Sequence, residues 1–261
     1  MPTRTFHEGT RKPGEIRSLT NIASEYAECP PIAVSGQNPS LRRRGRQTRA
    51  DSGRVLTHIK EILPPKDQTP GMAISTRHSA ASRVIDELGR DHKNVARLLS
   101  LMDKQLAALS RNEKPDFQVM ADIMSYMTHY PDMFHHPREE LVFTRLEKRS
   151  ADAARLIKEL RYEHQLLSES GADLFDSIKQ AINDQLVERE LLVTKAHGYS
   201  AMLLDHMRKE DAGIFPLAQV LLAPGEWAAI NREMDIPSDP LFEGKVEKGF
   251  LALQEFLTSH G

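Results

Sequence analysis

Four stretches of this chain each carry an apolar stripe with helical spacing, and every stripe is interrupted by histidine or by histidine and glutamate. Apolar residues that recur three and four positions apart form one face of an amphipathic helix. In chain order the stripes run through Ile85, Leu88, His92, Val95, Leu99, Met102 and Leu106; Met120, Met124, Met127, Pro131, His135, Glu139, Val142 and Leu146; Ala153, Ile157, Leu160, His164, Leu167, Gly171, Leu174 and Ile178; and Leu203, His206, Glu210, Ile214, Leu217 and Leu221. A buried charge without a partner costs roughly several kcal/mol, so these polar members demand an explanation.

The stripes predict an all-α fold, an up-down-up-down four-helix bundle with a C-terminal helical tail. Short connections between the stretches favour antiparallel neighbours. The expected bundle helices begin near Ser79 or Ser82 and cover residues up to 110, then 116–149, 151–182 and 187–222. The tail should contain a helical turn at 227–234 and an amphipathic segment at 244–257 that packs along the bundle.

Proline and glycine residues predict where these helices are irregular. Pro131 and Pro137 each remove a backbone donor and crowd the carbonyl four residues earlier, so the second helix should kink or break beside His135. The fourth helix should be interrupted near Gly198 or Gly213.

The N-terminal part of the chain differs in composition from the rest. Residues 1–71 hold 8 of the 15 prolines and 12 Lys and Arg against 7 Asp and Glu, and they show no sustained period. We therefore expect residues 1–78 to be a disordered, basic, proline-rich extension and residues 79–261 to form the bundle with its tail. Met72 is an alternative start, in which case the preceding residues are an over-extended start assignment.

Several classes of function are disfavoured by the sequence. The single cysteine, Cys29, excludes an intramolecular disulfide and any cysteine-built zinc or iron–sulfur site in one chain. No apolar run approaches the roughly 20 residues that span a bilayer, and we expect a cytoplasmic protein without membrane association. The basic stretch 41–49 lacks interleaved aromatics, so no specific nucleic-acid partner is expected. Hydrolase signatures are absent from the sequence.

Metal binding explains all six polar stripe residues at once. The candidate ligands are His92, His135, Glu139, His164, His206 and Glu210. Each glutamate follows a histidine by four positions, which places both on one helix face. Imidazole nitrogen and carboxylate oxygen together suit iron in either common oxidation state, and manganese or zinc less distinctively. If both glutamates bridge two metals and two histidines bind each metal, octahedral iron keeps up to two positions for a bridging group and an outside molecule.

A second histidine–glutamate pair competes with this assignment. His136 and Glu140 are also four positions apart, but their helix face is predicted to be more exposed to water. We therefore prefer the pair His135 and Glu139 as ligands. The neighbours of His136 and Glu140 on their face are Asp132, Phe143 and Glu147.

Further polar residues have supporting roles in this interpretation. Glu163 points about a third of a turn away from His164 and is a reserve ligand. Four tyrosines either supply hydrogen bonds to the ligands, shape an access route, or pack at the boundary of the core. They are Tyr126, Tyr130, Tyr162 and Tyr199.

The motifs resemble those of the hemerythrin-like proteins, also called HHE cation-binding domains. Residues 135–140, His-His-Pro-Arg-Glu-Glu, are similar to that family's second-helix signature. Residues 206–211, His-Met-Arg-Lys-Glu-Asp, followed by Ile-Phe-Pro-Leu at 214–217, are similar to its fourth-helix signature. The tail, with Glu-Trp at 226–227 and Asp-Pro-Leu-Phe at 239–242, is similar to that of many bacterial members. The resemblance runs from about residue 80 to the end.

The resemblance implies a carboxylate-bridged pair of iron ions, Fe2+ or Fe3+, with manganese not excluded. The implied ligands are His92 and His135 on one iron, His164 and His206 on the other, and Glu139 and Glu210 as bridges. Oxygen-carrying members have a second histidine one turn along the third helix, where this chain has Ser168. One iron is then more open, which puts simple reversible oxygen carriage in doubt.

Three functions follow from this resemblance. The first is a di-iron protein, related to stress responses, that binds or senses oxygen, nitric oxide or peroxide at the open iron positions, with redox turnover left open. The second is an iron-donating protein that repairs damaged iron–sulfur centres and has an iron–sulfur protein as its partner. That subgroup often carries an N-terminal cysteine-containing domain, whereas this chain has only Cys29. The third is a structural bundle that metal stabilises.

Overall fold

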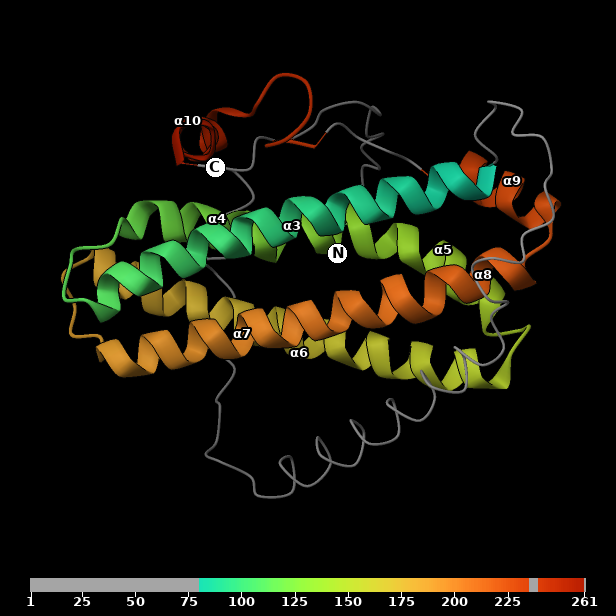
Figure 1. The fold of residues 1–261 in the computed structure, drawn as a ribbon, viewed down its shortest axis with the longest axis horizontal. Coiled ribbons are helices and arrows are strands. Elements are labelled where there is room, and N and C mark those ends of the chain that lie inside the picture. Colours follow the sequence, from blue (N-terminus) through green and yellow to red (C-terminus); the bar gives the residue numbers. More distant parts are fainter. Residues whose placement is uncertain (1–79, 235–238, 261) are drawn as a thin grey trace, which may run out of the picture. The chain divides into compact units, whose positions relative to one another are not determined.

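The computed structural model describes residues 80–234 and 239–260, and within these ranges the chain forms helices and no strands (Figure 1). In chain order the elements are α3 (Ala80–Ser110), α4 (Phe117–Tyr130), the π-helical turn η1 (Pro131–His135), α5 (His136–Leu146), α6 (Ala151–Ile182), α7 (Arg189–Lys209), the π-helical turn η2 (Glu210–Ile214), α8 (Phe215–Leu221), α9 (Pro224–Glu233), the 3-10 turn η3 (Lys248–Phe250) and α10 (Leu251–His260). The predicted all-α class is confirmed. Ser82 lies inside α3 rather than capping it. The predicted extension at residues 1–78, the candidate cap Ser79 and the alternative start Met72 lie outside the described residues.

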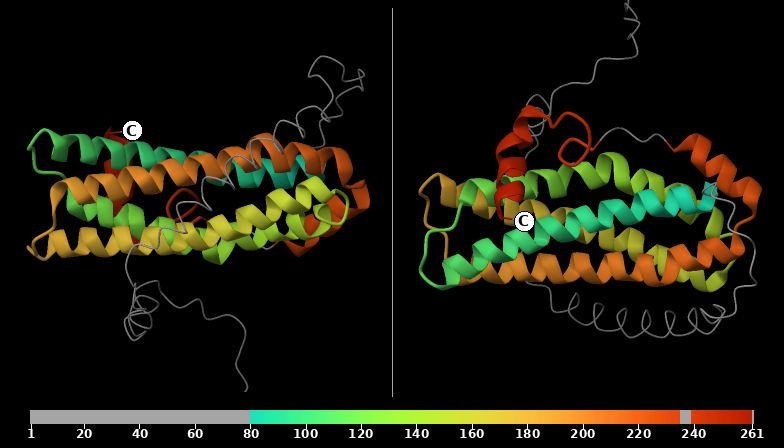
Figure 2. Two further views of the ribbon diagram at one scale, coloured as in Figure 1. Left: turned by 90° about the horizontal axis from the view of Figure 1, so that it is seen from below. Right: turned by 45° about the horizontal axis from the view of Figure 1, so that its top comes forward.

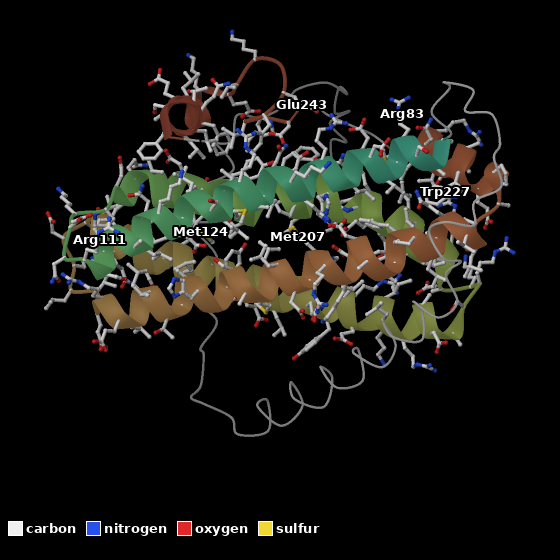
Figure 3. All side chains as sticks on the ribbon, in the orientation of Figure 1. Arg83, Arg111, Met124, Met207, Trp227 and Glu243 are labelled. Atoms are coloured by element: carbon white, nitrogen blue, oxygen red, sulfur yellow. The ribbon has the colours of Figure 1, made fainter. Side chains whose placement is uncertain are left out.

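The long helices pack side by side as a helical bundle (Figures 1 and 2). Helix α3 packs against α4 and α7, and α6 packs against α4, α5 and α7. Apolar side chains from all of these helices fill the interior, and Figure 3 shows Met124 and Met207 among them. The tail helices α9 and α10 pack against the bundle, α9 on α3 and α5, and α10 on α4.

The ends of the helices follow from local sequence. The Asp116 side chain accepts hydrogen bonds from the backbone N–H groups of the second and third residues of α4, and the Ser150 side chain accepts one from the third residue of α6, Ala153. The turns that follow α3 and α6 each contain a residue with positive φ, Asn112 at 62° and Asp184 at 54°. Asparagine and aspartate tolerate this conformation better than other residues with a side chain. These two residues therefore allow short turns after α3 and after α6.

Two π-helical turns occur where a proline follows in the sequence. The N–H of His136 donates to the carbonyl of Pro131, and the next residue is Pro137. The N–H of Phe215 likewise donates to the carbonyl of Glu210, and the next residue is Pro216. Because proline cannot donate and crowds the carbonyl four residues earlier, the helix widens by one residue just before it.

These turns confirm the predicted irregularities. The second bundle helix is irregular beside His135, which is the last residue of η1. The fourth is irregular at Gly213, within η2, whereas α7 continues through Gly198. Both π turns therefore include a candidate metal ligand, since Glu210 is the first residue of η2.

The described part of the tail is anchored to α4 by a buried carboxylate. The Tyr126 hydroxyl donates to Asp239 Oδ2 at 2.8 Å, and Asp239 Oδ1 accepts from the backbone N–H groups of Leu241 and Phe242 at 2.8 and 2.9 Å. Tyr126 is fully buried and its ring stacks on that of Tyr130.

We expect Tyr126→Phe to destabilise the protein by about 1–3 kcal/mol, because the buried Asp239 carboxylate loses a donor. Urea unfolding of the metal-free protein measures this change. Tyr162→Phe is the matched control, since the Tyr162 side chain is exposed and its change should stay within about 0.5 kcal/mol. Equal effects of the two substitutions would contradict the anchoring role of Asp239.

No single helix in the described ranges is long and apolar enough to cross a membrane. One pair of consecutive segments is long and apolar enough when taken together, Arg189–Leu221 with Pro224–Glu233, but the two are bent by 119° relative to each other.

Candidate metal centre

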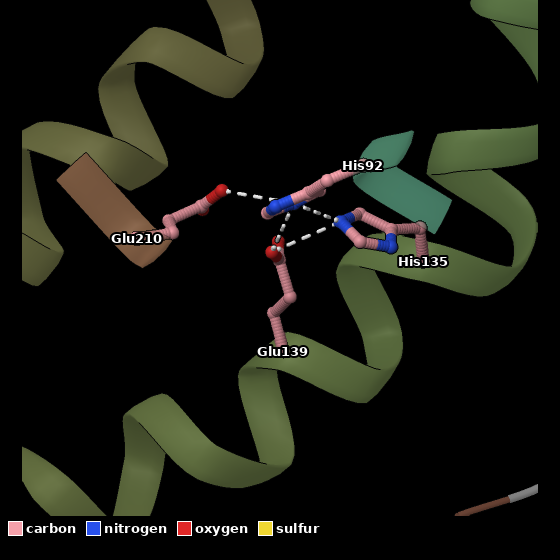
Figure 4. Close-up of side chains that lie close together, drawn as sticks. All are labelled: His92, His135, Glu139 and Glu210. Carbon is pink, nitrogen blue, oxygen red and sulfur yellow. Dashed lines mark hydrogen bonds and ion pairs between the residues drawn. The ribbon is translucent and has the colours of Figure 1, made fainter. Parts of the chain in front are cut away.

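The structure brings all six predicted ligands together inside the bundle. His92 comes from α3, His164 from α6 and His206 from α7. Glu139 and Glu210 are fully buried, and Figure 4 shows both carboxylates beside the imidazoles of His92 and His135. Potential ligand atoms of His92, His135, Glu139 and Glu210 lie within 4.8 Å of one another, as do those of His164, His206 and Glu210.

Each carboxylate spans the histidines of both groups. Glu139 Oε1 lies 3.0 Å from His135 Nε2 and 3.8 Å from His92 Nε2, and its Oε2 lies 3.5 Å from His164 Nε2. Glu210 Oε1 lies 3.1 Å from His206 Nε2 and 3.8 Å from His164 Nε2, and its Oε2 lies 3.4 Å from His92 Nε2. The two glutamates thus lie between the histidines, as bridging ligands would.

The centre of the cluster consists of groups that can all act as acceptors. The four carboxylate oxygens of Glu139 and Glu210, and Nε2 of His164, are buried and take part in no well-aligned hydrogen bond within the described part of the chain. The Nε2 atoms of His92 and His135 lie 3.1 Å apart. Buried polar atoms are nearly always partnered, and unpartnered ones need an explanation such as an ion. These ligand atoms therefore fit a cation, which would pair with every one of them.

Carboxylates hold the other ring nitrogen of three of the histidines. Nδ1 of His135 lies 2.9 Å from Asp91 Oδ2, and Nδ1 of His206 lies 3.0 Å from Glu163 Oε2. Nδ1 of His92 lies 2.9 Å from an oxygen of Asp211, which follows Glu210 in the chain. A proton on Nδ1 leaves the lone pair on Nε2 for the centre of the cluster, the usual arrangement around a metal-binding histidine.

Two of these supporting carboxylates, Asp91 and Glu163, each bind a buried basic residue, and the two arrangements repeat the same pattern. Asp91 accepts from Arg138 Nη2 at 2.7 Å, and Glu163 forms an ion pair with Lys209 Nζ. Arg138 and Lys209 each precede a candidate ligand glutamate in the sequence, and Asp91 and Glu163 each precede a candidate ligand histidine. Four of these supporting residues were not predicted from the sequence, namely Asp91, Asp211, Arg138 and Lys209. Their only signal was this adjacency to the ligands.

The repeat is broken at His164. The residue that corresponds to Asp211 is Glu140, which follows Glu139, but Glu140 accepts from Thr144 and Arg161. No carboxylate within the described ranges is hydrogen-bonded to Nδ1 of His164. The His136 ring lies against the His164 ring instead, with centroids 3.8 Å apart and planes 18° apart. The His164 side chain is also the most exposed of the six, at 15 %.

His136 and Glu140 do not form the competing pair of metal ligands. Glu140 pairs with Arg161, and His136 pairs with Asp132. One part of the prediction for this helix face is wrong, because Phe143 is fully buried rather than on a wet face. It packs in the hydrophobic core that α5 shares with α3, α6, α8 and α9.

Of the residues predicted to have supporting roles, some lie at the metal centre and others lie away from it. Glu163 supports His206 as described above. The Tyr130 hydroxyl donates to Asp91 at 3.4 Å and accepts from Arg138 at 3.2 Å, so it contributes to the support of His135. Tyr199 lines a cavity at the centre. Tyr126 binds the tail and Tyr162 is exposed, so neither supports a ligand.

A cavity of about 40 Å³ borders the cluster. This volume holds a water molecule or a ligand of a few atoms, since one water requires about 10–15 Å³ on this measure. Most of the surface area exposed in the cavity is apolar, although polar residues also line it, and four of the candidate ligands are among them. The residues are Asp91, His92, Val95, Met127, Thr128, Tyr130, Pro131, Asp132, His135, His136, Leu167, Ser168, Tyr199, Leu203, His206, Met207 and Glu210.

The electrostatics of the cluster favour charged imidazoles opposite charged carboxylates when no metal is bound. Burial opposes the charge on His206, but Glu210 and Glu163 raise the pKa of its imidazole to about 10. Burial likewise opposes the charge on His92, and hydrogen bonding to Asp211 raises its pKa well above the ordinary value. Burial opposes ionisation of Glu139 and Glu210, and the charge of Glu210 also opposes that of Glu139, but the imidazoles lower both pKa values.

We therefore expect metal binding to release protons. The raised imidazole pKa values contribute to the stability of the metal-free fold fully below about pH 6.5, and this contribution is lost as the pH rises toward 10. A metal ion must displace the same protons, so its affinity should rise by about tenfold per pH unit for each proton released. Titration with Co2+ between pH 6 and 8, with a pH indicator in weak buffer, measures both quantities. A pH-independent affinity without proton release would contradict this protonation state.

The fold and the site together define a metal-binding helical bundle. The family model of the hemerythrin HHE cation-binding domain matches residues 83–218, which is more than half of the 261 residues. The chain belongs to this family. Neither the curated proteins nor the solved structures include a match to the chain.

Proposed function

We propose that this protein holds two iron ions bridged by Glu139 and Glu210, and that it binds a small molecule such as oxygen, nitric oxide or peroxide in the adjoining cavity. In this assignment His92 and His135 bind one iron, and His164 and His206 bind the other. The neighbour pairs of the long helices support the up-down-up-down four-helix order expected for such a bundle.

The cavity is the observation that carries this proposal. It borders the imidazoles of His92, His135 and His206, and at about 40 Å³ it admits molecules of a few atoms but not an organic metabolite. Apolar side chains such as Val95 and Met127 line it, which suits an uncharged diatomic molecule. Iron supplies an electrophilic and redox-active centre there.

The protein's own residues orient the ligand nitrogens and exclude water. Asp91, Asp211 and Glu163 hold protons on Nδ1 of their histidines, which keeps the Nε2 lone pairs inward. Burial of Glu139 and Glu210 keeps bulk water from the carboxylates. A small molecule in the cavity therefore meets the metal pair in a largely dry environment.

Metal content and the optical spectrum of the full chain, loaded with Fe2+ without air, test this proposal. We expect two irons per chain and an absorption band that changes when azide, nitric oxide or oxygen is added. Iron that stays bound through gel filtration supports a binding or sensing role. Rapid transfer of the iron to an apo acceptor without a ligand-dependent spectrum supports iron donation instead. Loading that raises only the melting temperature supports a structural metal.

A substitution at the cavity tests the access route separately from the metal. Ser168 lines the cavity and is exposed, so Ser168→Trp should slow azide binding several-fold while iron content stays unchanged. Glu169→Trp is the matched control, because Glu169 is exposed and adjacent but does not line the cavity. Equal rates in the two variants would contradict entry beside Ser168.

A further inference from the structure

His136 lies at the edge of the candidate metal centre, although the ligand set does not use it. It is the first residue of α5, its side chain is 21 % exposed, and it lines the cavity. Potential ligand atoms of His136, Glu139 and His164 lie within 4.8 Å of one another. A third imidazole is therefore within reach of the cation that His164 and His206 would hold.

His136 also has the carboxylate support that three of the four candidate ligand histidines have. Its Nδ1 lies 2.9 Å from Asp132 Oδ1, just as Nδ1 of His135 lies 2.9 Å from Asp91. A proton on Nδ1 leaves the lone pair of His136 on Nε2. In contrast, an ordinary surface histidine does not need a carboxylate partner that selects one tautomer.

The cation beside His164 and His206 has room for this ligand. With both glutamates it has four protein ligands, two fewer than octahedral iron accepts. The residue one turn after His164 is Ser168, which also lines the cavity and leaves the His164 side open. We propose that His136 is a further ligand of this cation, an inference that rests on the proposed function.

Ligation by His136 requires its ring to turn. The rings of His136 and His164 lie nearly parallel at 3.8 Å, so in this arrangement their lone pairs run side by side instead of converging on one point. Asp132 can follow such a rotation, because its side chain is 49 % exposed and belongs to the π turn η1. A ligand that must leave a stacked position to bind is readily displaced. Since His136 lines the cavity, it competes with a small molecule for the same cation.

Two substitutions separate ligation from stacking. His136→Ala removes both the nitrogen and the ring, whereas His136→Phe removes the nitrogen and keeps an aromatic ring against His164. His129→Phe is the matched control, because His129 is half-buried on α4 but does not line the cavity. Co2+ is the probe, since its visible absorption strengthens as the coordination number falls. Circular dichroism of the metal-free variants checks that all are folded.

The expected result is that His136→Ala and His136→Phe both bind the second Co2+ about 10- to 100-fold more weakly than the wild type, with stronger visible absorption per ion. Both should also bind azide more tightly once they are loaded, because the competing imidazole is gone. His129→Phe should match the wild type in each measurement.

The contrary results are distinct. A wild-type protein that binds fewer than two Co2+ ions defeats the proposed function and this inference with it. A wild type with two ions, together with a His136→Phe variant of unchanged affinity and absorption, overturns the role of His136 alone and leaves the di-metal centre standing. Weakening in His136→Ala but not in His136→Phe assigns His136 to stacking and likewise overturns ligation.

Discussion

Replacement of Glu210 by alanine should remove both metal ions from the protein. One Glu210 oxygen lies 3.1 Å from His206 Nε2 and the other lies 3.4 Å from His92 Nε2, so the carboxylate faces both halves of the cluster. Loss of a shared ligand weakens both cations together. We expect about two metal ions per chain in the wild type and fewer than about 0.2 in the variant after gel filtration.

The stability gained from metal should disappear with it. A cation present at 100 times its Kd stabilises the folded state by about 2.7 kcal/mol, and this increment should vanish in Glu210→Ala. Comparing the loaded and metal-free forms of each variant cancels the effect of the substitution on folding. Glu140→Ala is the matched control, because Glu140 adjoins Glu139 but pairs with Arg161 at the surface. Retention of one full equivalent in Glu210→Ala would show that Glu210 serves only one cation.

Arg138→Met should cost about 3–5 kcal/mol of folding stability, the largest effect expected for a residue outside the ligand set. Arg138 is 3 % exposed and donates to Asp91 at 2.7 Å and to the carbonyl of Phe134 at 2.8 Å. Its removal leaves the buried Asp91 carboxylate with His135 and a long bond from Tyr130. Metal affinity should also fall by about 10- to 100-fold, because Asp91 orients His135.

A control and a double variant separate the two effects of Arg138. Arg145→Met changes an arginine of the same helix whose partner Glu233 is half-exposed, and it should cost only about 1 kcal/mol or less. Asp91→Asn combined with Arg138→Met removes both buried charges, so stability should partly recover while metal affinity stays low. Full recovery of metal affinity in the double variant would contradict the role of Asp91 in orienting His135.

The six-residue cluster could be predicted from the sequence because helical periodicity fixes which side chains share a face. His135 and Glu139 interrupt an apolar row at a spacing of four, and His206 and Glu210 repeat that signal. Apolar neighbours on each row indicated burial. The structure places all six side chains together, with Glu139 and Glu210 fully buried.

Glu163 was predicted only as a reserve ligand, and the hydrogen bonds around the cluster could not be predicted because periodicity describes one helix at a time. Asp91 and Glu163 lie about 100° around their helices from the neighbouring histidine, at positions that usually face the boundary of a bundle. Their partners, His135 and His206, are on other helices. Lys209 would pass for a surface residue on composition alone, yet it is 2 % exposed because Glu159 and Glu163 pair with it.

The form of the helical irregularities also could not be predicted from the sequence. Pro131 and Pro137 predicted a kink or break, since either outcome removes the conflict with the earlier carbonyl. In the structure the helix has no break, and the irregularity is one wider turn before Pro137. Which solution a chain adopts depends on how the flanking helices pack, and local chemistry does not decide it.

Each wide turn behaves as a one-residue insertion. Deleting Met133, whose side chain is exposed and lies outside the core, would let α4 run into α5 as an ordinary helix. Because the extra residue is accommodated within the turn itself, the segments on either side of it would keep nearly the same orientation, and Tyr130 would still face Arg138. The π turn therefore lets the chain carry one additional residue beside the cluster without moving the side chains that flank it.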